Sequence, residues 1–222
     1  MLIGSITISF GGLVVRNIET ADNWQINFYR SIAFGTAILI VLLFRYGKTG
    51  LQQFKGIGLQ GVWAAMLLAC ASISFLQAIT NTTVAATTFT LSSIPFLTAI
   101  MAWLFLGERI GKSTVFTMLV AAIGISLMFV QGLGSGTLFG NFMAFLCAIG
   151  FSSYAVIIRR NRRTEMLPTL ILSNLIIVFA ALIFRWDNLL ISWSDLLLCF
   201  VLGGLLSATV NTLFIIASKH LF

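Results

Sequence analysis

Charged side chains are scarce in this chain, and their scarcity excludes a soluble fold. Only 9% of the 222 residues are Asp, Glu, Lys or Arg, whereas a soluble domain has about 25%. Apolar residues make up 59% of the chain. Even a well-packed soluble domain of 150 residues leaves exposed about 30% of the surface of its unfolded chain. A soluble fold of this size therefore cannot hide this much apolar side chain from water. The composition therefore predicts an integral membrane protein that contacts the lipid bilayer.

Residues that build metal sites, disulfide frameworks and linkers are also few. The chain has three Cys, one His and two Pro. Cys70, Cys147 and Cys199 lie inside apolar runs without CxxC spacing, as buried hydrophobic residues do. We therefore expect no metal site and no cofactor. The small number of prolines and the absence of polar low-complexity sequence predict no long linker between domains.

Acidic residues are absent from the interior of every apolar run, which argues against an enzyme. No pair of carboxylates is available for acid–base chemistry in the membrane, and His220 has no candidate partners for a catalytic triad. We expect no enzymatic activity. The six acids are Glu19, Asp22, Glu108, Glu165, Asp187 and Asp195.

Eight apolar runs have about the length that a helix needs to cross a bilayer. They are continuously apolar and do not alternate, which favours helices over a β-barrel. The first run is short, and the last is followed by only five residues, where another loop and span would be expected. The fold class expected is an all-α polytopic membrane protein. The runs are 2–15, 26–44, 61–79, 84–106, 113–130, 138–158, 167–184 and 196–217.

The basic residues fall mainly on one side of these spans. Ten Lys or Arg lie in loops on that side and only Arg16 and Arg185 on the other. The positive-inside rule then places the N-terminus in the cytoplasm. We expect the protein in the cytoplasmic (inner) membrane. The cations are too dispersed to track a nucleic-acid backbone, so no nucleic-acid partner is expected.

A faint internal repeat relates the two ends of the chain. Residues 8–16 resemble residues 151–159, and the third span can be aligned with the eighth. Because five spans separate the partners, the two copies would have opposite orientations in the membrane. Such inverted repeats are typical of secondary transporters.

Arg30 is the one charged residue inside a span, about one turn from the start of the second run. It could face a watery cavity and bind a carboxylate or phosphate of a substrate. Alternatively, it could extend its guanidinium to the outer interface, since Asn27 and Tyr29 are of types found there.

Polar residues form faces on three further spans. In the third, Trp63, Cys70, Ser74, Gln77 and Asn81 share one helical stripe. Ordinary helix packing is the favoured interpretation of the Ser and Thr residues, whereas the amides slightly favour a pathway. Pro95 permits a kink that could line a cavity. The predicted substrate pathway comprises Arg30, Trp63, Ser74, Gln77, Asn81, Thr88, Ser92, Pro95, Ser207 and Asn211.

A charged turn follows the fourth span. Gly107 is typical of a helix end, and Glu108 and Arg109 come directly after it at the predicted cytoplasmic side. A simple interfacial turn is the favoured interpretation, with a gating or proton-linked role for Glu108 as the alternative.

Residues 93–110, SIPFLTAIMAWLFLGERI, resemble the end of the fourth helix in EamA-type proteins of the drug/metabolite transporter superfamily. Residues 122–127, Trp24 with residues 28–30, and residues 140–160 are similar to other segments of that family. The resemblance implies ten helices in two inverted five-helix repeats around a central cavity. Residues 1–134 would form the first repeat and residues 135–222 three helices of the second.

The resemblance implies a secondary transporter or exporter of small polar metabolites, such as amino-acid-like, anionic or zwitterionic solutes, working by alternating access. The ninth and tenth helices of the family are absent from this sequence, so either the chain is a fragment, or a second copy in a homodimer or another chain would complete the cavity. Two alternatives remain: efflux of cationic drugs, and a membrane scaffold or assembly subunit that transports nothing itself.

Overall fold

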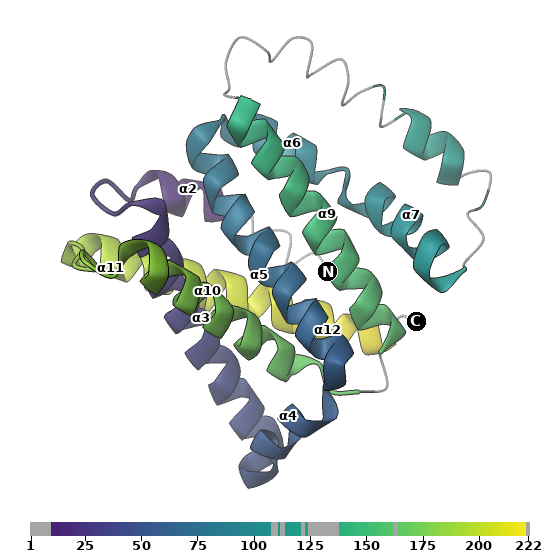
Figure 1. Ribbon diagram of the computed structural model, residues 1–222, viewed down its shortest axis with the longest axis horizontal. Helices are drawn as coiled ribbons and strands as arrows, with labels where there is room; N and C mark the ends of the chain where they lie inside the picture. Colours follow the sequence, from purple (N-terminus) through teal and green to yellow (C-terminus); the bar gives the residue numbers. More distant parts are fainter. Residues whose placement is uncertain are drawn as a thin grey trace. The chain divides into compact units, whose positions relative to one another are not determined.

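The computed structural model describes residues 10–107, 111, 114–120, 123, 138–161 and 164–220, and the regular structure within them is helical (Figure 1). Residues 114–120 are helical as well as the named elements. The α-helices are α2 (Gly11–Arg16), α3 (Asn23–Tyr46), α4 (Gln53–Gly56), α5 (Gly58–Asn81), α6 (Val84–Leu91), α7 (Ile94–Leu106), α9 (Leu138–Arg160), α10 (Leu167–Arg185), α11 (Trp193–Phe200) and α12 (Ala208–His220). A 3-10 segment, η1, spans Gly47–Gln52, and a π-helical segment, η2, spans Val201–Ser207.

Six stretches of the described residues are long and apolar enough to cross a membrane. They confirm six of the predicted spans, with ends that differ by a few residues. The predicted runs 2–15 and 113–130 lie largely outside the described residues, so the total of eight remains a prediction. The six stretches are Asn23–Tyr46, Gly58–Asn81, Val84–Leu106, Leu138–Arg160, Leu167–Arg185 and Trp193–Ile215.

The fourth predicted span is interrupted near its middle. Helix α6 ends at Leu91 and α7 begins at Ile94, with Pro95 in the first turn of α7. Proline has no backbone N–H and cannot continue the hydrogen-bond ladder of the preceding turn, so the chain bends where the sequence predicts a kink. The backbone N–H groups of Phe96 and Leu97 both donate to the Ser93 carbonyl, each at 3.0 Å, and restart the ladder.

The sequence predicts the end of α7 but not the change of helix type in the last span. Helix α7 ends at Gly107, whose φ of 69° lies in the left-handed region that glycine adopts without strain. This confirms the predicted helix end. The last predicted span, in contrast, consists of α11, the π-helical η2 and α12. Its wider middle turns contain the pair Gly203 and Gly204, and apolar periodicity does not reveal this change of helix type.

The chain divides into two compact units. The first comprises residues 1–69 and 161–222, and the second comprises residues 70–160. In the first, α3 packs against α10, α11 and η2. In the second, α9 packs against α6 and α7. These units reflect spatial contact, whereas the repeat boundary between residues 134 and 135 is a feature of the sequence and remains a prediction.

Helices α3 and α10 run antiparallel in the first unit, with a register set by contacts along their whole length. Residues later in α3 contact residues earlier in α10. The pairs are Asp22 with Arg185, Trp24 with Phe184, Gly35 with Asn174, and Tyr46 with Glu165. This register shows which residues of α10 lie level with each side chain of α3.

Candidate functional site

Arg30 is buried within the first unit. It lies two turns inside α3 rather than one, because the helix begins at Asn23 and not at the predicted Ile26. Only 5% of the residue is exposed, and its Nη2 donates to Oδ1 of Asn27 at 3.0 Å. Burial of Arg30 favours the interpretation of a cation inside the protein over one at the membrane interface.

The π-helical segment η2 packs directly on the backbone of α3 at this arginine. A Cβ atom at Gly203 would lie 2.1 Å from the Arg30 carbonyl oxygen, so only glycine permits the approach. A Cβ at Gly204 would lie 3.7 Å from the Ala33 carbonyl oxygen, an ordinary contact. Gly203 therefore allows η2 to approach the backbone of α3 at the residue whose charge is buried. π-helical turns inside α-helices are frequent at functional sites.

Asn27 and Ser31 flank Arg30 and were not among the predicted pathway residues. The structure buries both residues: Asn27 is 0% exposed, and Ser31 is 1% exposed. Their four-residue spacing places them on one face of α3. That spacing around an intramembrane arginine is the sequence signal by which both residues could have been found.

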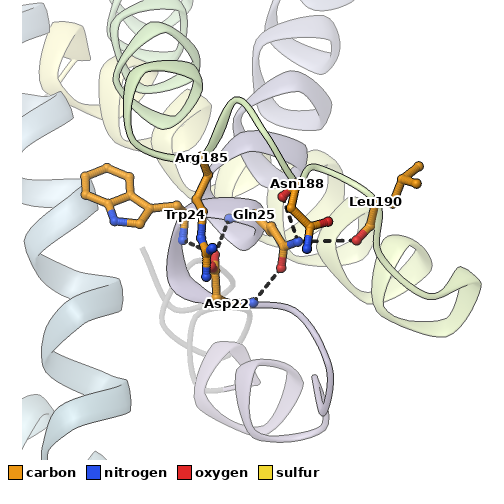
Figure 2. Close-up of polar contacts among 6 residues, drawn as sticks. All are labelled: Asp22, Trp24, Gln25, Arg185, Asn188 and Leu190. Carbon is orange, nitrogen blue, oxygen red and sulfur yellow. Dashed lines mark hydrogen bonds and ion pairs between the residues drawn. The ribbon is translucent and has the colours of Figure 1, made fainter.

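The N-terminus of α3 is held by a polar cluster that connects it to the end of α10 (Figure 2). Asp22 accepts from the backbone N–H groups of Trp24 and Gln25, each at 2.9 Å, and forms an ion pair with Arg185. Gln25 completes a capping box, because its Oε1 accepts from the Asp22 N–H at 2.8 Å. Its Nε2 also donates to the carbonyls of Asn188 at 3.0 Å and Leu190 at 3.2 Å.

A second acidic residue fixes the loop before α3. Asp195, near the start of α11, accepts from the backbone N–H groups of Glu19, Thr20 and Ala21 at 3.3, 3.0 and 3.1 Å, and from the Thr20 hydroxyl. Asp195 is only 2% exposed. Tyr29 adds a hydrogen bond of 2.9 Å to the Leu189 carbonyl. Side chains at the starts of α3 and α11 thus connect the loops at this end of the unit.

At the opposite end of the unit, Glu165 precedes α10. Its carboxylate accepts from the Tyr46 hydroxyl and from the Leu167 N–H, the latter at 3.3 Å. Like Asp195, Glu165 is buried although it lies at the end of a helix. Both carboxylates accept hydrogen bonds from groups that hold helix ends and loops, which indicates a structural role for each.

Two predicted pathway residues of the last span belong to this same unit. The Ser207 hydroxyl donates to the Leu202 carbonyl at 2.8 Å, and Nδ2 of Asn211 donates to the Ser207 carbonyl at 3.0 Å. Both side chains are half-buried. Oδ1 of Asn211 is buried and has no hydrogen-bond partner among the described residues.

The other predicted pathway residues lie on α5, α6 and α7, except Ser92, which lies between α6 and α7. Trp63 is 56% exposed, in the part of α5 that belongs to the first unit. In the second unit Ser74 is buried, and Asn81 donates to the Gln77 carbonyl at 2.8 Å. Thr88 and Ser92 are exposed.

The Thr and Ser hydroxyls among these residues mostly donate to backbone carbonyls of their own helix. Thr88 donates to the Val84 carbonyl at 2.8 Å and Ser92 to the Phe89 carbonyl at 2.6 Å. Pro95 is exposed at the start of α7, where the Ile94 carbonyl accepts from Ser152 of α9 at 3.1 Å. Glu108 and Arg109 lie outside the described residues. Across the described ranges, no group of three or more His, Cys, Asp or Glu could hold a metal ion.

Comparison with known proteins identifies the family. The model of the EamA-like transporter family matches residues 1–130, more than half of the chain. The chain belongs to the EamA-like transporter family. It is therefore an integral membrane protein of the drug/metabolite transporter superfamily, which is a group of transporters and not of enzymes.

A solved structure supports the fold of this EamA-like chain. A protein described only as a crystal structure aligns with 98% of this chain and with 78% of its own, at a TM-score of 0.72 and 16% sequence identity. At this identity the similarity concerns the fold alone. A search of curated proteins gives no match.

Asp22 of the EamA-like chain offers a test of the polar cluster in Figure 2. Asp22→Asn keeps an N-cap oxygen but removes the ion pair with Arg185, so we expect a loss of only about 0.5 kcal/mol of stability, since both side chains are partly exposed. Asp22→Ala also removes the cap and should cost about 1–2 kcal/mol more. Thermal unfolding in detergent measures both. Equal effects of the two variants would contradict the capping role.

Proposed function

We propose that this EamA-like protein is a secondary transporter of small polar metabolites that carry a negatively charged group, such as amino-acid-like, anionic or zwitterionic solutes. The observation that carries the proposal is the buried Arg30. A charged residue is costly in the interior of a membrane protein and is retained there mainly for function. A guanidinium in such a place attracts carboxylates and other oxyanions.

The position of the acids supports an anionic over a cationic substrate. A carrier of cationic drugs needs an intramembrane carboxylate to pair with its cargo. The two buried acids of the described residues, Glu165 and Asp195, lie at helix ends and accept hydrogen bonds from their surroundings. Nothing in the described part of the chain therefore favours efflux of cations.

We further propose the architecture and setting typical of the family. These are ten helices in two inverted repeats, eight of them in this sequence, a cytoplasmic N-terminus and an inner-membrane location. The basic loops support the orientation, because ten Lys or Arg fall on one side of the predicted spans. Substrate would move by alternating access around the central cavity.

Transport in liposomes tests the proposal. The full chain is reconstituted, and uptake of radiolabelled L-alanine and pyruvate down a gradient is compared for the wild type, Arg30→Lys and Arg30→Ala. We expect uptake by the wild type, a loss of at least about tenfold in Arg30→Ala, and poor rescue by lysine, which cannot present a planar pair of donors.

Arg16→Ala serves as the matched control, because Arg16 is an exposed arginine of the same unit. It should retain wild-type uptake. If Arg30→Ala transports as well as Arg16→Ala, the buried arginine is not part of the pathway. If the wild type moves neither solute but co-purifies with another membrane protein, the scaffold function replaces the transporter.

A further inference from the structure

Asn27, Arg30 and Ser31 form a buried set of hydrogen-bond donors on one stretch of α3. They are 0%, 5% and 1% exposed, respectively. Oδ1 of Asn27 accepts from Arg30 Nη2, which fixes the orientation of the amide and leaves its Nδ2 as a donor. Within the described part of the chain, Nδ2 of Asn27 and Oγ of Ser31 have no hydrogen-bond partner.

On the α10 side, the side chains level with these donors provide no acceptor. Between the contacts Trp24–Phe184 and Gly35–Asn174, the antiparallel register brings Asn27 level with Ala181 and Ser31 level with Ile177. Both of these α10 residues are buried, and residues 175–184 contain no polar side chain. Buried donors without an acceptor are rare in proteins, because they lose their hydrogen bonds to water and gain none in return. Such donors indicate that a bound molecule supplies the acceptor.

We propose that Asn27, Arg30 and Ser31 form a subsite for a single carboxylate group of the transported solute. The proposal rests on the proposed transport function and adds to it the residues and the class of ligand. The carboxylate accepts from the guanidinium of Arg30, from Nδ2 of Asn27 and from the hydroxyl of Ser31. The subsite is closed in this structure, since all three residues are buried, and it opens for the solute to enter.

The balance of buried charge favours a ligand with a small negative charge. Arg30 is the only buried Lys or Arg among the side chains that the structure describes, whereas Glu165 and Asp195 of the same unit are buried acids. A phosphate group carries a charge of about −1.5 to −2 at neutral pH and would bury more negative charge than a single carboxylate.

Thermal unfolding of the purified full chain tests the ligand class. Pyruvate, pyruvamide and inorganic phosphate are added in turn, and the unfolding midpoint is recorded. We expect pyruvate to raise the midpoint in a concentration-dependent manner, and pyruvamide, which has a neutral amide in place of the carboxylate, not to do so. Stabilisation by phosphate greater than that by pyruvate, or none by pyruvate, would overturn the proposal.

Two substitutions separate the subsite from a structural role. Asn27→Asp places a carboxylate beside Arg30 within the protein, so it should weaken pyruvate binding and uptake at least about tenfold while raising the midpoint of the ligand-free protein. Ser31→Ala removes a hydroxyl without a partner, so it should weaken binding about tenfold without lowering that midpoint. Thr36→Ala is the control, because the exposed Thr36 hydroxyl donates to the Ile32 carbonyl of its own helix at 2.8 Å.

The outcomes distinguish this subsite from the transport function. If Arg30→Ala abolishes uptake while Asn27→Asp and Ser31→Ala behave like Thr36→Ala, the subsite is refuted and the transporter stands. If the wild type moves no carboxylate solute, both proposals fail. Loss of uptake in Asn27→Asp together with a lower midpoint would assign Asn27 to packing alone and also refute the subsite.

Discussion

Replacing Gly203 by alanine is expected to destabilise the protein by about 3 kcal/mol, the upper part of the range for overpacked sites. The added Cβ would lie 2.1 Å from the Arg30 carbonyl oxygen, 2.9 Å from its carbonyl carbon and 3.0 Å from its Cα. These are backbone atoms in the middle of α3 and cannot rotate away as the end of a side chain can. Relief therefore requires η2 and α3 to move apart, which also displaces Arg30.

The neighbouring glycine is a matched control for this prediction. A Cβ at Gly204 would meet the Ala33 carbonyl oxygen at 3.7 Å and the Ala33 Cβ at 3.8 Å, both ordinary contacts. Alanine is also a better helix former than glycine, so Gly204→Ala should be neutral or slightly stabilising. Thermal unfolding in detergent compares the two variants. If they unfold at the same temperature, η2 does not pack as closely on α3 as the structure indicates.

Asp195→Ala is expected to cost about 3 kcal/mol, because four donors lose a shared carboxylate. Three are backbone N–H groups of residues 19–21 and the fourth is the Thr20 hydroxyl. Asp195→Asn should be milder. An amide oxygen at the place of Oδ2 retains the three bonds from Thr20 and Ala21, whereas the bond from Glu19 to Oδ1 is lost.

Hydrogen exchange and thermal unfolding measure this effect. In Asp195→Ala the amides of residues 19–21 should exchange faster, and the unfolding temperature should fall. Asp187→Ala provides the comparison, since Asp187 is an exposed acid of the same α10–α11 connection. Unchanged exchange at residues 19–21 would show that the loop is held by other contacts.

The extent to which the sequence predicts the site is clear from Arg30 and its neighbours. Arg30 was identifiable because it is a charge within an apolar run, a property of the run alone. Asn27 was not, because an amide near the end of a span is equally typical of an interface. Its burial depends on the start of α3 at Asn23, which the Asp22 cap determines, and on α10 packing alongside.

The polar cluster of Figure 2 lay beyond sequence reasoning for a related reason. Asp22 and Arg185 are separated by 163 positions in the chain. Asp195 and Thr20 are separated by 175. All four residues lie near the ends of spans, where charged and polar residues are common in ordinary loops. The antiparallel register of α3 and α10 identifies Arg185 as the partner of Asp22, and the packing of α11 on α3 brings Asp195 to Thr20.

Hydropathy, the kink at Pro95 and the helix end at Gly107 were determined by the sequence itself, because each is a property of a few consecutive residues in contact with lipid or with their own backbone. Membership of a transporter family likewise followed from a continuous segment. The tertiary structure alone decided that Gly203 packs on the Arg30 backbone and that Asn27 and Ser31 are buried donors facing an apolar helix. Those facts depend on which helix faces pack together. The packing of two helices is determined by the shapes and the register of segments that are distant in the chain.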